Sequence, residues 1–111
     1  MQMLDIRSLQ ATMRARVEKT DEYLDWLDGL RDRAGRARIL VRVDRLIEGN
    51  PGQHRDLTDG VSELKLDFGP GYRVYYTLRG RRLLLLLLGG DKSTQQKDIE
   101  TAVRLAKNFK E

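Results

Sequence analysis

The stretch GVSELKLDFGPGYRVYYTLRGRRLLLLLLGGDK, residues 60–92, predicts three consecutive antiparallel strands and the two turns that join them. Apolar and polar residues alternate over 63–68, which is the pattern of a strand with one buried face. Glycine and proline at 69–71 predict the first turn, and Gly80-Arg81 predicts the second. The remainder of the chain is expected to cover this sheet with helices.

Pairing about the first turn places Lys65 opposite Tyr75 and Asp67 opposite Arg73. In that register apolar side chains meet apolar ones on one face, and a slip of one residue would destroy the match. The other face is partly open, and any chemistry is expected there. Its exposed part is expected to collect Lys65, Asp67, Arg73, Tyr75 and Arg79.

The six consecutive leucines at 83–88 lack alternation, which predicts a central strand that is buried on both faces. The run is far too short to span a membrane. The second turn is expected to set Arg79 opposite Arg82. In that register Leu83, Leu85 and Leu87 lie on the apolar face, and Leu84, Leu86 and Leu88 share a face with Thr77, Tyr75 and Arg73.

Helices are predicted on both sides of these strands. Thr20, followed by two acidic residues, predicts the start of a helix that ends near Gly29. A second helix is expected over 32–48, and the two should form a hairpin on one face of the sheet. Ser93 or Thr94 caps a final helix, whose apolar stripe is expected to lie over the second leucine set or to bind a partner helix. That stripe consists of Ile99, Ala102, Val103, Ala106 and Phe109.

Alternation over 12–18 predicts a further strand, and 53–60 is expected to be a polar loop. The fold class is therefore α+β, in the order strand, helix, helix, three strands, helix, within one domain of residues 1–111. Residues 1–11 have little pattern and are expected to be a loose leader or an extension of the following strand. The N-terminal region has no apolar run suited to a signal peptide, which predicts a cytoplasmic protein that is not in a membrane.

The absence of cysteine excludes disulfides and thiolate metal sites. Scattered acidic residues, and the lack of a glycine-rich loop before a helix, predict no metal site and no organic cofactor. The net charge of +4 and the pI near 9.6 are compatible with binding to nucleic acid.

Three further features have a structural and a functional interpretation. The arginines of 31–45 are interpreted as a solvated helix face, with RNA contact as the alternative. Trp26 is expected to pack in the core or between helices rather than to stack on a base. His54, the single histidine, is expected in an exposed loop, with catalysis as the alternative.

The element order, together with GVSELKLDFGPGYRVYY at 60–76 and LLLLLLGGDKSTQQKDI at 83–99, resembles the RelE/ParE superfamily of bacterial toxin–antitoxin toxins. More narrowly, it resembles the addiction module killer proteins, or HigB-like toxins. The resemblance covers roughly 14–106 and implies a RelE/ParE-like fold. RelE-type members cut messenger RNA in the ribosomal A site, and ParE-type members poison DNA gyrase, so the fold alone does not choose between them.

The resemblance implies a role for three catalytic candidates. Lys65 corresponds to a lysine that RelE-type enzymes use as a base or charge stabiliser, Arg73 to their phosphate-binding arginine, and Lys92 to a position near a second arginine that supports the leaving phosphate. Glu63 departs from the family pattern, where another lysine stands. No tyrosine lies near Asp98 to stack on the substrate. The candidate RNA-binding residues are Tyr75, as a substitute for that tyrosine, with Arg79, Arg81 and Arg82.

The expected function is that of a type II toxin that cleaves messenger RNA on the ribosome without a metal. Two alternatives stay open: a non-hydrolytic gyrase poison of ParE type, and an inactive relative that binds ribosomal RNA. Asp67 is either part of the site or a plain ion-pair partner of Arg73. The expected partners are the ribosome, messenger RNA and an antitoxin, which in the HigB-like branch typically carries a helix-turn-helix domain.

Overall fold

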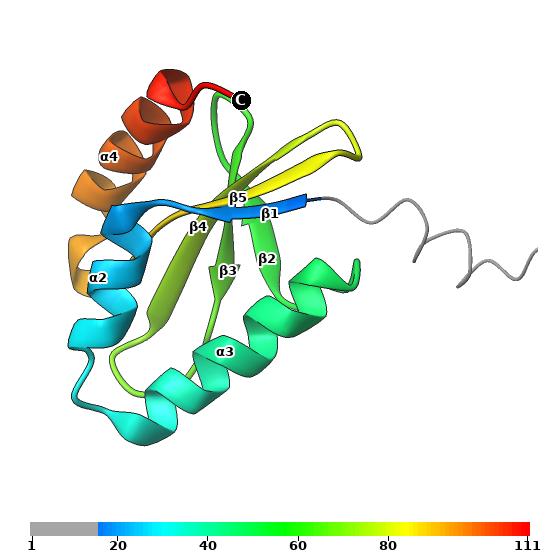
Figure 1. The fold of residues 1–111 in the computed structure, drawn as a ribbon. Helices are drawn as coiled ribbons and strands as arrows, with labels where there is room; N and C mark the ends of the chain where they lie inside the picture. Colours follow the sequence, from blue (N-terminus) through cyan, green and yellow to red (C-terminus); the bar gives the residue numbers. More distant parts are fainter. Residues whose placement is uncertain (1–15) are drawn as a thin grey trace, which may run out of the picture.

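The computed structural model describes residues 16–111, where a sheet of five strands has helices on both faces (Figure 1). The strand order across the sheet is β1-β5-β4-β3-β2. The α+β class is therefore confirmed, whereas the expected leader at 1–11 lies outside the described residues. In chain order the elements are β1 (Arg16–Lys19), α2 (Asp21–Gly29), α3 (Arg33–Ile47), β2 (His54–Asp56), β3 (Val61–Lys65), β4 (Tyr72–Arg79), β5 (Leu83–Asp91), the short 3₁₀ helix η1 (Lys92–Thr94) and α4 (Gln95–Asn108).

The three strands of the deciding stretch form as predicted and are β3, β4 and β5. The described part of the expected N-terminal strand is β1, which pairs parallel with β5. The prediction of a loop at 53–60 was wrong in part, because His54–Asp56 forms the edge strand β2. All three of its side chains are polar and exposed, so no apolar alternation marks it.

The β3–β4 register differs from the prediction by two residues, and Lys65 lies opposite Arg73 rather than Tyr75. The loop covers 67–71, because the Leu66 N–H donates to the Tyr72 carbonyl at 3.0 Å and closes the ladder there. An even shift keeps every side chain on its predicted face. Asp67 leaves the ladder, and no ion pair joins it to Arg73 within the described chain.

The β4–β5 register was predicted wrongly by one residue over Tyr76–Arg79, because the turn takes in Arg82 and sets Arg79 opposite Leu83. A β-bulge between Tyr75 and Tyr76 makes the difference two residues beyond it, so Leu88 lies opposite Tyr75 on its predicted face. An odd shift exchanges the faces of the strand. Leu84 and Leu86 therefore pack under α2 and α3, and the expectation that α4 lies over them was wrong. The leucines that pack with α4 are Leu83, Leu85, Leu87 and the partly buried Leu88.

Each face of the sheet has its own core, and Figure 1 shows α3 and α4 at opposite sides of the strands. Under α2 and α3, Ile39 and Val43 pack against the first face, as the predicted helical hairpin requires. Under α4, Ala102 and Ala106 are buried against the leucines of β5. Small side chains at these two positions let the helix approach the sheet closely.

The helix starts follow from local capping. Thr20 accepts a hydrogen bond from the Tyr23 N–H at 3.0 Å, which confirms the predicted cap. Asp32 caps α3 by accepting from the Gly35 N–H at 2.9 Å, and the Tyr72 hydroxyl donates to the other oxygen of Asp32 at 2.8 Å. This second bond ties the start of α3 to the start of β4.

Trp26 packs between α2 and the sheet, as expected, with ring centroids 6.1 Å from Tyr23 and 6.5 Å from Tyr72. Its ring lies directly on the backbone of Gly89 in β5. A Cβ atom at that position would come within 2.0 Å of the indole. Only glycine fits there, which gives a structural reason for the first glycine of the LLGGDK segment.

No helix among residues 16–111 is long and apolar enough to cross a membrane.

Replacement of Gly89 by alanine tests this contact. We expect Gly89→Ala to lower the free energy of unfolding by about 1–3 kcal/mol, because the methyl group overlaps the Trp26 ring. Urea unfolding followed by circular dichroism measures the change. Gly29→Ala is the matched control, since a Cβ there meets nothing within 4 Å, and it should be neutral or slightly stabilising. Equal stability of the two variants would contradict the packing described.

The tyrosines predict a loss of stability at alkaline pH. Burial raises the pKa of all 4 tyrosines, and that of Tyr23 reaches about 12. The folded protein therefore keeps these protons after the unfolded chain has lost them, from pH 10.0 upward. The tyrosines contribute no pH dependence below that pH, and the free energy of unfolding should fall as pH rises from there toward 12. Tyr23→Phe should reduce the slope; an unchanged slope would contradict the burial of this phenol.

Candidate functional site

An open pocket of about 500 Å³ lies beside the β3–β4 loop, where β4 begins and β5 ends. Four cationic side chains and one carboxylate, that of Asp67, contribute to its lining. This excess of positive charge suits an anionic ligand. The lining residues are Arg55, Lys65, Asp67, Phe68, Gly69, Pro70, Gly71, Arg73, Lys92 and Gln95.

The three catalytic candidates predicted from the sequence, Lys65, Arg73 and Lys92, all line this pocket. Lys65 and Arg73 are directly paired across β3 and β4, so their side chains project from the same face. Lys92 follows the last residue of β5 and is exposed. The structure brings the three together, and their catalytic roles stay predictions.

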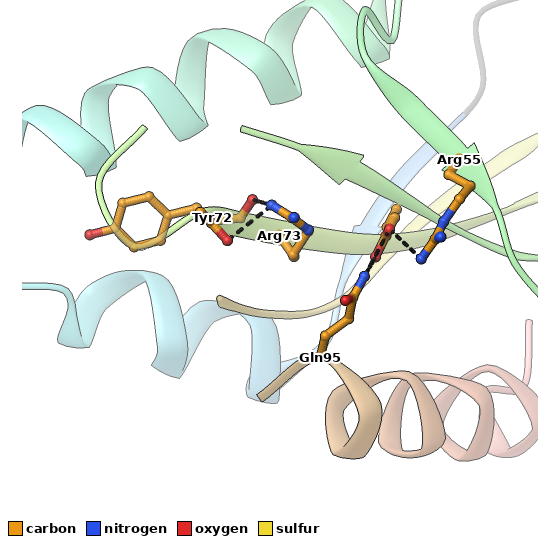
Figure 2. Close-up of polar contacts among 6 residues, drawn as sticks. Arg55, Tyr72, Arg73 and Gln95 are labelled. Carbon is orange, nitrogen blue, oxygen red and sulfur yellow. Dashed lines mark hydrogen bonds and ion pairs between the residues drawn. The ribbon is translucent and has the colours of Figure 1, made fainter. Parts of the chain in front are cut away.

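The Arg73 guanidinium is fixed by its own turn. Its Nη1 donates to the carbonyls of Gly71 at 3.0 Å and Tyr72 at 3.1 Å (Figure 2). The side chain is only 5% exposed, and its Nε is buried without a partner. Nη2 has no hydrogen bond to any residue in the described range 16–111 either. Nε and Nη2 are therefore both without a partner, but Nε is covered from solvent, so Nη2 is the donor that a ligand in the pocket can reach.

Gly71 lets the cationic side chains approach each other. Its φ of +80° favours glycine, and a Cβ there would lie 3.3 Å from the Cβ of Lys92 and 3.5 Å from Nη1 of Arg73. Lys92 and Arg73 therefore both lie next to the space that a side chain at this position would fill. The sequence GPGYR encodes this proximity through its second glycine.

Arg55 and Gln95 were missed by the sequence analysis. Both converge on Glu63, which is fully buried (Figure 2). Gln95 Nε2 donates to the two carboxylate oxygens at 3.1 and 3.0 Å, and Arg55 Nη2 forms an ion pair at 3.0 Å. The signal in the sequence was Glu63 itself, a carboxylate in a strand between buried positions, which requires polar partners.

Comparison with known proteins places the chain in a family. The family model of the phage-derived Gp49-like proteins (DUF891) matches residues 25–110, which include the whole pocket. The chain belongs to the Gp49-like family. Members of this family are commonly RelE-like toxins of toxin–antitoxin systems.

A protein of Haemophilus influenzae, described as an uncharacterized protein, is 42% identical over 97 residues, which cover 87% of this chain and 98% of that protein. No solved structure matches the Gp49-like chain significantly. The RelE/ParE-like fold therefore stays a prediction, with which the observed α+β arrangement is compatible.

The expectation that Tyr75 is exposed for stacking on RNA was wrong. In this Gp49-like protein Tyr75 is fully buried and packs with Val61 and Leu85 beneath α4. Its hydroxyl has no hydrogen-bond partner, and burial raises its pKa. A buried ring cannot stack on a base. The prediction failed because α4 covers the face of the sheet from which Tyr75 projects.

Arg79, Arg81 and Arg82, also predicted to bind RNA, lie at the far end of β4. Arg79 lies six residues along β4 from Arg73, so about 20 Å separates it from the pocket. Arg79 donates to the carbonyls of Ala106 and Phe109 and thereby ends α4. Arg81 and Arg82 are exposed, and RNA contact by them stays a prediction for a surface apart from the pocket.

Two arginines of α3 have structural contacts, in contrast to the expected solvated face. Arg42 donates to the carbonyls of Lys65, Pro51 and Gln53 and so fixes the ends of β2 and β3. The Arg38 guanidinium lies 4.2 Å from the centroid of the Phe68 ring. His54 is exposed, as expected. No group of three or more His, Cys, Asp and Glu suited to a metal occurs in the described part of the chain.

Inorganic phosphate tests the anion site. We expect phosphate to stabilise the protein by about 1.4 kcal/mol at a tenfold excess over its Kd, and Arg73→Ala to abolish that stabilisation. Thermal unfolding in phosphate and in a chloride buffer of equal ionic strength measures it. Arg104→Ala, an exposed change on α4 outside the pocket lining, should retain the effect. Equal stabilisation of all three proteins would show that phosphate binds elsewhere.

Proposed function

We propose that this protein is the toxin of a type II toxin–antitoxin system and cleaves messenger RNA on the ribosome without a metal. The observation that carries the proposal is the incompletely paired guanidinium of Arg73 in a pocket lined by four cationic side chains. A buried guanidinium with unpaired N–H donors costs free energy, part of which a bound phosphate would recover. The Gp49-like family, commonly composed of toxins, supports the same direction.

The proposed reaction assigns one role to each of the basic side chains Arg73, Lys65 and Lys92. Arg73 binds a non-bridging oxygen of the scissile phosphate and stabilises the charge of the phosphorane. The neutral amine form of Lys65, on the paired strand position, takes the proton of the 2′-hydroxyl and becomes an ammonium, while the freed oxygen attacks phosphorus. The bond from phosphorus to the 5′-oxygen breaks, and Lys92 gives that oxygen a proton. The products are a 2′,3′-cyclic phosphate and a 5′-hydroxyl end.

The ribosome is needed because the pocket orients RNA poorly by itself. Phe68 is the single aromatic residue in the described lining, and Arg38 already covers its ring. The lining therefore offers phosphate contacts without an evident platform for a base. In the RelE-type enzymes that this chain resembles, the ribosome supplies much of the orientation, and the same arrangement fits here.

A second candidate function is a gyrase poison of ParE type, which needs no catalytic lysine. It is favoured by Glu63, buried where RelE-type enzymes have a lysine, and by the burial of Tyr75. The third candidate, an inactive relative that binds ribosomal RNA, shares the cationic pocket but predicts no cleavage. An assay that maps RNA ends separates the nuclease from the other two candidates, and a gyrase supercoiling assay separates those two from each other.

The partner that the family suggests is an antitoxin. We propose that an acidic segment of the antitoxin binds the cationic pocket of the toxin and covers Arg73 and Lys92. As the HigB-like resemblance implies, the antitoxin would carry a helix-turn-helix domain. Its gene is expected beside that of the toxin.

Cell-free translation of a defined messenger RNA tests the proposal. Wild-type protein should cut the message within the translated region, and Arg73→Ala should lower the cleavage rate at least about 100-fold, because the phosphorane loses its main electrostatic partner. Primer extension maps the cuts. Arg104→Ala should cleave normally.

Intact messenger RNA in the presence of wild-type protein would exclude the nuclease. Trapped cleavage complexes in a gyrase supercoiling assay would then favour the ParE-type function. The absence of both effects, with binding to ribosomes, would favour the inactive relative.

A further inference from the structure

Arg55 is a second arginine in the wall of the pocket, from β2 rather than from the strands of the predicted site. Its side chain is 53% exposed, and its Nη2 lies 3.0 Å from a Glu63 oxygen. This is its single recorded polar contact with the described residues. Most of its five N–H donors are therefore available to a ligand in the pocket.

The buried carboxylate of Glu63 restricts the orientation of Arg55. Glu63 cannot move freely, because Gln95 at the start of α4 donates to both of its oxygens. An arginine anchored through one nitrogen loses less side-chain entropy when it binds than an unanchored one. The ion pair thus prepares Arg55 for a ligand, although the negative charge of Glu63 weakens its attraction for an anion.

The strand register separates Arg55 from Arg73. Arg55 lies opposite Glu63, whereas Arg73 lies opposite Lys65, two positions further along β3. Two strand spacings and two residues of rise place their Cα atoms on the order of 12 Å apart. Figure 2 shows the two guanidiniums turned toward different partners. Two separate phosphates suit this arrangement better than one phosphate shared by both arginines.

We propose that Arg55 forms a second phosphate subsite, which binds the phosphate adjacent in the RNA strand to the phosphate held by Arg73. The subsite rests on the proposed function, because it assumes RNA as the ligand of the same pocket. Arg55 acts in binding and positioning, and Glu63 and Gln95 orient it. The ligand must therefore carry two successive phosphodiesters to gain the full affinity.

Two probes that differ by one phosphate test the subsite. Both are RNAs with 2′-O-methyl groups, which the chain cannot cleave: a dinucleotide with a single phosphodiester and a trinucleotide with two. Titrations followed by the backbone amide signals in NMR give the Kd of each probe at several salt concentrations. The ratio of the two Kd values isolates the contribution of the second phosphate.

For the wild-type protein, we expect the trinucleotide to bind about fivefold more tightly than the dinucleotide. Its salt slope should be steeper by about 0.7, the value for one additional phosphate contact on a single strand. Arg55→Ala should remove both differences and leave the Kd of the dinucleotide unchanged. Arg73→Ala should weaken both probes. Arg104→Ala should behave as wild type.

Arg55→Ala also removes the counter-ion of buried Glu63 and can destabilise the protein. The double variant Arg55→Ala with Glu63→Gln removes the buried charge as well, and Arg55→Lys keeps the positive charge without the planar fork. The double variant should stay folded and bind the two probes with equal Kd. Arg55→Lys should retain part of the preference for the trinucleotide.

Equal loss of affinity for both probes in the Arg55 variants, or no loss for either, would overturn the subsite and leave Arg55 as the counter-ion of Glu63. Failure of the proposed function looks different. If both probes bind with the expected increment but translated messenger RNA stays intact, the nuclease proposal fails and the subsite is supported. Absence of binding for both probes overturns the subsite, whatever the cleavage assay shows.

Discussion

The direct pairing of Lys65 with Arg73 across β3 and β4 places two positive charges side by side in the wall of the pocket. Two cations on facing strand positions repel each other, and nothing in the described chain neutralises them by an ion pair. Gly71 lets Lys92 approach from the end of β5 and adds a third positive charge. The sheet keeps these charges together because two apolar cores fix its faces. An anionic ligand would relieve this repulsion, and Arg55 in the same lining would add to its attraction.

The sequence identified β3, β4 and β5 with their antiparallel pairing and the starts of α2 and α3, but it missed β2 and the register between strands. The expected side-chain cap of α4 is absent, because Thr94 makes no capping hydrogen bond. The GPG segment is compatible with either a short or a longer loop, and the two-residue difference was harmless because it preserved the faces. In the run Leu83–Leu88 one leucine looks like the next, so no side chain marks the register. The turn then took one more residue, Arg82, and the faces of Leu83–Leu87 were exchanged, until the β-bulge restored the predicted face at Leu88.

The sequence predicts the site residues whose positions depend on one hairpin. It does not predict those whose positions depend on the packing of distant elements. Lys65 and Arg73 follow from one hairpin. Arg55 could not be found, since β2 has three exposed polar residues and owes its strand conformation to pairing with β3. Tyr75 was misplaced because the alternation of a strand does not tell which face a distant helix will cover. The helix α4 packs against that face and buries Tyr75.

The two outermost strands have a consequence for how the protein behaves in a crowded solution. A strand of six leucines is a strong template for intermolecular β-pairing and for amyloid-like assembly. Here β1 occupies its open side, and β1 itself is short and charged, with Arg16, Glu18 and Lys19. At the opposite boundary, polar β2 blocks the same kind of association. The leucine strand is thus protected from self-assembly only once the N-terminal strand has docked, although that strand is synthesised well before its partner.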